Sequence, residues 1–168
     1  MTLSEYVDRH LRPPRHGEMP QYVFDAQITM ATDMTTDIPP HPWFNKTLIL
    51  QQFMLGPAFS GAPPHIHGTV STIITYSEFS NHCALSIGPA ANHLVHGVKH
   101  WIVQPPSDAF FAFKPVREWY EEDYASAPAG DQRECTQFGG DIAVIPSGWG
   151  HAVVNLAESI ALAYEYHD

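Results

Sequence analysis

The stretch GDIAVIPSGWGHAVVN, Gly140–Asn155, decides the fold. Asp141–Ile145 is a short apolar run, Pro146–Gly148 has the composition of a tight turn, and Ala152–Asn155 continues a second apolar run after His151. Short apolar runs separated by Pro and Gly predict two β-strands rather than a helix, which would need a longer uninterrupted period. His151 therefore stands at the start of a buried strand.

A second histidine group lies upstream, in the segment PPHIHG at residues 63–68. In a strand, residues i and i+2 point to the same face, so His65 and His67 project together. Antiparallel pairing would bring His151 beside them. Three ligands on one face of an ion leave its other positions open, as non-heme iron oxygenase chemistry requires. The three imidazoles are candidate metal ligands, and the alternative is that His65 and His67 are ordinary loop histidines.

The rest of the chain favours an all-β fold. Short β-type runs bounded by Gly, Pro, Asn or Ser occur at 47–55, 69–76, 84–87, 93–95, 100–103 and 159–166. Thr2 and Glu5 form a capping-box pattern at the start of a short helix that Pro13 ends. Further helical candidates are 26–34 and 114–126. Many short strands with turn residues between them predict a sandwich or a barrel.

Composition limits the function classes. The chain has 168 residues, enough for one domain with a real core. Its formal net charge of −10 argues against nucleic acid and anionic membranes and permits basic peptide partners. No apolar run could span a bilayer and no signal peptide is evident, so the expected location is cytoplasmic or nuclear. Cys83 and Cys135 form no close pair and are read as ordinary thiols.

Several motifs together resemble the JmjC-domain proteins of the cupin superfamily, and most closely the small JMJD8-like JmjC-only proteins. The motif Gly-x5-Pro-x-Gly-x2-His-x3-Asn ending at Asn155 resembles the second cupin motif. The other matching segments are Gly97-Val98-Lys99-His100-Trp101 with Pro105-Pro106, Glu134-Cys135-Thr136, Ser60–Gly68 and the N-terminal segments 1–11 and 22–25. The resemblance covers nearly the whole chain.

This resemblance implies a double-stranded β-helix jelly roll with a short N-terminal helix and one helical insertion. We expect a single JmjC-like domain over residues 1–168. Residues 1–46 would form an N-terminal lead-in and 47–168 the jelly-roll core. Residues 69–87 stand out as an unusual insertion, which could form a hairpin over the mouth of the site.

The resemblance also implies a chemistry. His65 and His151 match the family's two metal histidines, which hold Fe(II). Lys99 matches the lysine that pairs with the distal carboxylate of 2-oxoglutarate, and Asn92 matches a polar position near this cosubstrate. The implied protein is a dioxygenase, a hydroxylase or demethylase of a protein or peptide substrate. The sequence leaves the oligomeric state open, and an exposed edge-strand lysine remains the alternative for Lys99.

One position departs from the family. Its catalytic members carry Asp or Glu where this chain has His67, and a neutral imidazole does not offset the charge of Fe(II). Three outcomes stay open: an oxygenase with impaired catalysis, a three-His cupin enzyme with a substrate other than 2-oxoglutarate, and a non-catalytic binding module. Glu78 or His82, within the insertion, could supply a replacement ligand.

Overall fold

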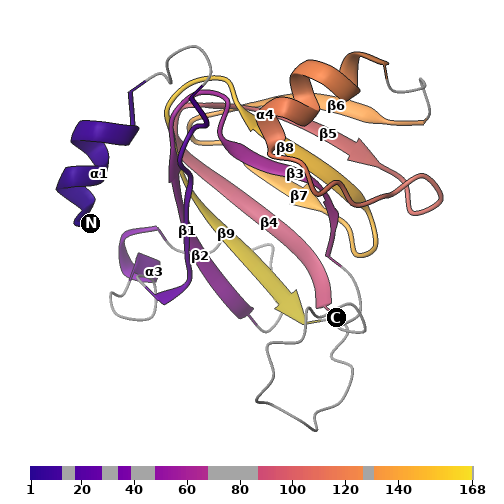
Figure 1. The fold of residues 1–168 in the computed structure, drawn as a ribbon. Helices are drawn as coiled ribbons and strands as arrows, with labels where there is room; N and C mark the ends of the chain where they lie inside the picture. The colour runs from indigo at the N-terminus through magenta and orange to yellow at the C-terminus, as the bar shows by residue number, and fades with distance from the viewer. Residues whose placement is uncertain (13–17, 28–33, 39–47, 68–86, 127–130, 168) are drawn as a thin grey trace, which may run out of the picture.

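The computed structural model describes residues 1–12, 18–27, 34–38, 48–67, 87–126 and 131–167. Within them the strands form two antiparallel sheets, one of five strands in the order β1-β2-β9-β4-β7 and one of four in the order β3-β8-β5-β6. Figure 1 shows the two sheets facing each other as the layers of a sandwich. The architecture is the all-β jelly roll of the cupin type.

The larger sheet is built from the chain's two ends and its middle. Its strands are β1 (Val23–Asp25), β2 (Leu48–Gly56), β9 (Ser159–His167), β4 (Ile87–His96) and β7 (Ile142–Ile145). Strand β9 lies at the centre, where it pairs with both β2 and β4. The last strand of the chain therefore presents alternate side chains to the space between the sheets.

The smaller sheet contains β3 (Gly61–Ile66), β8 (Gly150–Asn155), β5 (Val98–Gln104) and β6 (Arg133–Phe138). Strand β8 is buried along its whole length and lies between β3 and β5. Strand β3 is at the edge, where Pro63 and Pro64 are tolerated because an edge strand has unpaired positions that need no N–H donor. A continuous helical segment, α4 (Val116–Glu118), η2 (Trp119–Asp123) and η3 (Tyr124–Ser126), packs near β3 and β8.

The N-terminal segments are attached to the larger sheet. Helix α1 (Leu3–His10) begins with a complete capping box between Thr2 and Glu5. Tyr6, its one buried side chain, donates hydrogen bonds from its hydroxyl to the carbonyls of Gln21 and Leu55. These contacts hold α1 against the end of β2 and the segment that precedes β1. The short helix α3 (Met34–Asp37) follows β1.

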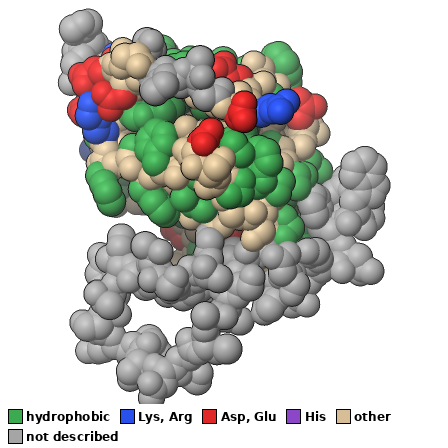
Figure 2. Space-filling model, turned by 90° about the vertical axis from the view of Figure 1, so that its right-hand side faces the viewer, with side chains coloured by type: hydrophobic (Ala, Val, Ile, Leu, Met, Phe, Trp, Pro, Cys, Tyr) green, Lys and Arg blue, Asp and Glu red, His purple; other side chains and the backbone are tan. Residues whose placement is uncertain are grey.

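Hydrophobic side chains are prominent on one outer face of the described chain. Figure 2 shows hydrophobic side chains over much of this face, with acidic and basic groups scattered among them. Exposed large hydrophobic side chains include Phe110, Phe111 and Phe113, the last of which is 97% exposed. The acidic excess of the chain does not gather into one patch on this face. Among the described residues, no helix has the length and apolar character needed to cross a bilayer.

Most of the predicted elements are present where they can be checked. The predicted strands at 93–95, 100–103 and 159–166 lie within β4, β5 and β9, and the strand predicted at 47–55 corresponds to β2 from Leu48 onward. The helix predicted at 114–126 is present from Val116. Of the strand predicted at 84–87 only Ile87 is described, and it begins β4. Strand β6 was not predicted, because five of its six residues are exposed and no apolar alternation marks it. The predicted strand at 69–76 and most of the helix at 26–34 lie outside the described residues, as does the 69–87 insertion except Ile87.

Candidate metal centre

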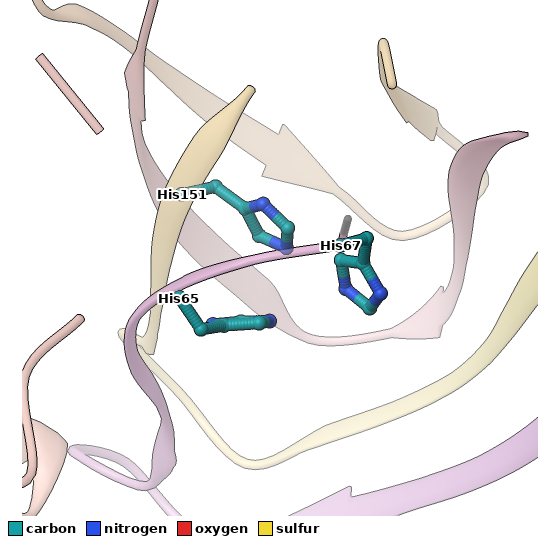
Figure 3. A group of neighbouring side chains, drawn as sticks. All are labelled: His65, His67 and His151. Atoms are coloured by element: carbon teal, nitrogen blue, oxygen red, sulfur yellow. The ribbon is translucent and has the colours of Figure 1, made fainter. Parts of the chain in front are cut away.

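The pairing of β3 with β8 brings the predicted histidines together. His65 and His151 are direct partners in the antiparallel register. Their ring centroids lie 4.2 Å apart, and each lies 5.0 Å from the ring of His67. One nitrogen from each residue falls within 4.8 Å of the others. Figure 3 shows the three rings converging from the two strands.

Two of the rings are oriented by groups behind them. The Nδ1 of His65 lies 2.8 Å from the carbonyl oxygen of Pro63, to which it donates in the Nδ1–H tautomer. The Nδ1 of His67 lies 3.2 Å from an Oε1 of Glu165 on β9. In each case the Nε2 lone pair is left free, which is the form in which histidine binds a metal with support from a second shell.

The surroundings of His65 and His151 favour the neutral state that a metal ligand requires. Burial and the neighbouring His67 lower the pKa of His65 to about 4. Burial, with His65 and His67 nearby, lowers the pKa of His151 well below its ordinary value. The ring of His151 packs 5.8 Å from the indole of Trp101, whose Nε1 donates to Gln137. Rigid packing of this kind fixes the position of the ring.

Lys99 lies in the same interior, on β5. Its side chain is 1% exposed, and its ammonium donates to the Oδ1 of Asn155 at 2.8 Å and approaches the hydroxyl of Tyr22 at 3.4 Å. Both of these partners are neutral. Burial lowers the pKa of Lys99 to about 7, because no charged group compensates for the loss of water.

Asn155 is itself held in one orientation. Its Nδ2 donates to the Oγ of Ser60 at 2.9 Å, and that hydroxyl donates to the carbonyl of Pro57 at 2.7 Å. The amide oxygen of Asn155 therefore points at Lys99. The asparagine that ends the predicted motif is a positioning residue for the lysine, a role that the motif itself did not reveal.

A single cavity between the sheets joins these groups. It is lined by all three histidines and by Lys99, Asn92 and Glu165, with Tyr22 and Trp101 among the aromatic groups. Asn92 is 5% exposed and its Nδ2 approaches the sulfur of Met54 at 3.4 Å, while its Oδ1 has no hydrogen-bond partner among the described residues. The five site residues expected from the sequence thus share one cavity. The alternative of an exposed Lys99 does not apply.

Two residues of this cavity that contact the predicted site, Tyr22 and Glu165, were not identified as site residues from the sequence. Tyr22 lies in segment 22–25, which was matched only as part of the family's lead-in, and Glu165 lies outside every motif. Only the folding of the two sheets brings these residues near Lys99 and His67. Period-2 alternation in β9 could have indicated an inward Glu165, since Ala163 lines the same cavity. Glu78 and His82, the candidates for an added ligand, lie outside the described residues.

Comparisons with known proteins agree on one group of relatives, although no family model matches the chain. The chain is 26% identical over 171 residues to human JmjC domain-containing protein 8, covering 97% of this chain and 57% of that protein. It is 27% identical over 146 residues to the bifunctional arginine demethylase and lysyl-hydroxylase psr-1 of Caenorhabditis briggsae, covering 76% of this chain and 30% of that protein. The chain is JmjC-like.

Another relative of this JmjC-like chain is the arginine-specific demethylase JMJ22 of Arabidopsis thaliana, 26% identical over 175 residues, with 89% of this chain and 31% of that protein covered. The JmjC-like chain therefore spans between about a third and about half of the length of these relatives. Its fold resembles the ribosomal oxygenase YcfD of Escherichia coli, with a TM-score of 0.56, 14% identity and coverage of 90% of this chain and 32% of the other.

Proposed function

We propose that this JmjC-like protein is an Fe(II)- and 2-oxoglutarate-dependent oxygenase that hydroxylates or demethylates a protein side chain. The observation that carries the proposal is the shared cavity: the buried ammonium of Lys99 and the three converging imidazoles line the same space. An enzyme of this class needs a metal site and an anion site in one cavity. A three-His centre for an unrelated substrate would not need a buried lysine beside it.

The donor set fits a divalent transition metal. His65, His67 and His151 would hold the ion through nitrogen, a ligand type that suits Fe(II) as well as Zn(II) and Cu(II). When bound, Fe(II) with 2-oxoglutarate supplies the oxidising chemistry. The chain's own part is to favour the neutral form of His65 and His151 through burial and to orient His65 and His67 through Pro63 and Glu165.

Lys99 fits the second half of such a site. A buried ammonium with neutral partners is under-compensated, so a carboxylate that enters the cavity gains a strong charge-assisted hydrogen bond. Tyr22 can donate to the same carboxylate, because its hydroxyl lies 3.4 Å from the ammonium. Asn92 also lines the cavity, and its Nδ2, which within the described chain contacts only the weak acceptor sulfur of Met54 at 3.4 Å, is a further candidate donor to the ligand.

The names of the relatives support the substrate class that we propose. Two of them are named for arginine demethylation, and one also for lysyl hydroxylation. We propose a protein or peptide substrate of similar kind. We also propose that residues 1–168 work as one domain, because the lead-in, residues 1–46, contributes Tyr22 to the cavity of the core, residues 47–168.

A second candidate is a three-His metal enzyme with another substrate. The presence of His67 at the position where the family has a carboxylate favours it. In that case Lys99 would serve packing rather than anion binding, and 2-oxoglutarate would have no measurable affinity for the metal-loaded protein.

The experiment is to load the purified protein with Fe(II) anaerobically, admit oxygen and measure succinate released from 2-oxoglutarate. We expect release by the wild type, loss in His151→Ala and a large rise in the 2-oxoglutarate KM in Lys99→Met. Lys114→Met is the matched control, since Lys114 is exposed and paired with Glu122 and Asp123. Metal binding without 2-oxoglutarate binding or turnover would favour the second candidate.

A further inference from the structure

Among the described residues the cavity is lined by one acidic side chain, Glu165. Its position bears on the presence of His67 where catalytic members of the family carry a carboxylate. Glu165 is the only carboxylate among the described residues that line the cavity, and Lys99 is the only lysine or arginine. Glu165 belongs to β9 of the larger sheet, whereas His67 follows β3 of the smaller one. The 3.2 Å contact between them therefore crosses the interior of the sandwich.

We propose that Glu165 is a positioning residue for the metal centre, which restores from the opposite sheet the negative charge that His67 does not carry. This inference rests on the proposed function of the site. The carboxylate accepts the Nδ1–H of His67, fixes that tautomer and directs Nε2 to the centre of the group. The Glu165 carboxylate stands behind the ring of His67 rather than among the converging nitrogens. Among the described residues, only His65, His67 and His151 bring their ligand atoms within 4.8 Å of one another.

Charge counting supports this role. With a divalent ion, the Lys99 ammonium and three neutral imidazoles, the cavity would carry a charge of about +3, and a dicarboxylate ligand would leave it at about +1. A buried net charge of this kind is strongly disfavoured in a low-dielectric interior. The Glu165 carboxylate brings the sum for the complex to about zero. Its side chain is 12% exposed, so water screens it little.

The environment of Glu165 makes a purely structural ion pair a poor explanation. Its partner, His67, has a side chain 23% exposed that also faces the other two rings. His67 can donate its Nδ1–H to the carboxylate on one side and offer Nε2 on the other, and this arrangement is the common one behind metal-binding histidines.

The test compares metal affinity in Glu165→Gln, which keeps an acceptor but loses the charge, and Glu165→Ala, which loses both. Chelator competition with Co(II) or Zn(II) gives the dissociation constant. We expect a weakening of about 10- to 100-fold, with the alanine variant at least as weak as the glutamine variant. Glu158→Gln is the control, because Glu158 also lies near a histidine, His96, at 3.7 Å, but both side chains are more than half exposed.

The outcomes separate the two proposals. A wild-type protein that binds no metal contradicts the metal centre itself. A wild-type protein that binds metal with an affinity unchanged in both Glu165 variants contradicts the role of Glu165 alone. X-ray absorption of the Zn(II)-loaded proteins supplies a further check: the same nitrogen shell is expected in wild type and Glu165→Gln. Loss of an oxygen ligand in the variant would mean that Glu165 binds the metal directly and would overturn the positioning role.

Discussion

At the scale of single residues, the cavity depends on groups whose charge is costly to bury. Lys99 is the clearest of them, since within the described chain its ammonium has only Asn155 and Tyr22 as hydrogen-bond partners and almost no exposure. A protein under selection for stability alone would place an apolar residue here. The burial of an under-compensated lysine is therefore an indication of binding, because a ligand carboxylate supplies the missing charge.

Replacement of Lys99 by Met should stabilise the ligand-free protein at neutral pH. The folded-state pKa of about 7 lies below the ordinary value of 10.5, so the unfolded chain holds more protons between these pH values. The stability advantage of Lys99→Met is then greatest at and below pH 7, on the order of a few kcal/mol, and shrinks as the pH rises toward 10. Urea unfolding in EDTA at several pH values measures it. A pH-independent difference would contradict the buried-charge argument, and Lys114→Met is the control.

Tyr22→Phe tests the contribution of the lead-in. Loss of one hydroxyl from the anion site should weaken 2-oxoglutarate binding by about two- to tenfold, the range expected for one hydrogen bond. Calorimetry of the Zn(II)-loaded protein under anaerobic conditions gives the affinity. Tyr120→Phe, on the helical segment beside His100, is the control. An unchanged affinity would remove Tyr22 from the ligand site and leave it as packing.

At the scale of elements, the pairing of β3 with β8 sets the geometry of the site. Gly61 begins β3 with a φ of +145°, and a Cβ at this position would collide with the backbone of Val153 on β8. The glycine lets the two strands approach closely and so fixes the register that places His65 opposite His151.

Gly61→Ala should therefore destabilise the fold by about 2 kcal/mol or more and weaken metal binding together with it. Gly140→Ala is the matched control, since Gly140 also has a positive φ, of 96°, but open space where the Cβ would lie. The control carries the backbone strain without the collision. Thermal unfolding and chelator competition measure both effects, and equal losses in the two variants would show that the close approach of β3 to β8 is unimportant.

The sequence predicted elements well where the pattern was local. The turn at Pro146–Gly148 and the capping box at Thr2 depend on neighbours in the chain, and both are present. The HxH spacing correctly placed His65 and His67 on one side because strand periodicity is local as well. Strand β6 escaped notice because its outward-facing residues carry no apolar pattern, and its pairing with β5 is a tertiary effect.

The site was predictable only in part, for the same reason. Its histidines and Lys99 lie in motifs, whereas Glu165 acquires its place from the register between β9 and its neighbours. Period-2 alternation along this strand can suggest that Glu165 faces inward, but it does not show that the carboxylate meets His67 from the opposite sheet. The link from Asn155 through Ser60 to Pro57 likewise joins residues almost a hundred positions apart, which no spacing rule describes.

At the scale of the whole molecule, the cavity joins the two sheets, so occupancy should be coupled to global stability. A metal that binds only the folded protein stabilises it by about 2.7 kcal/mol at a concentration a hundred times its dissociation constant. Addition of Zn(II) or Co(II) should raise the Tm of the wild type by several degrees, and EDTA should reverse the rise. His151→Ala should show no shift, while His96→Ala, whose side chain is 61% exposed, should behave as the wild type. A shift retained in His151→Ala would place the bound metal elsewhere.

The three ligands are not equally anchored. His151 stands on a strand enclosed on both flanks, whereas His65 and His67 stand on, or directly after, the outermost strand of the smaller sheet. An ion held by all three would therefore act as a cross-link that ties a peripheral strand to an interior one. Amide hydrogen exchange along β3 should slow on loading, while that of β8, already protected from solvent, should change little. Entry and release of the ion would accordingly be controlled by fraying of β3.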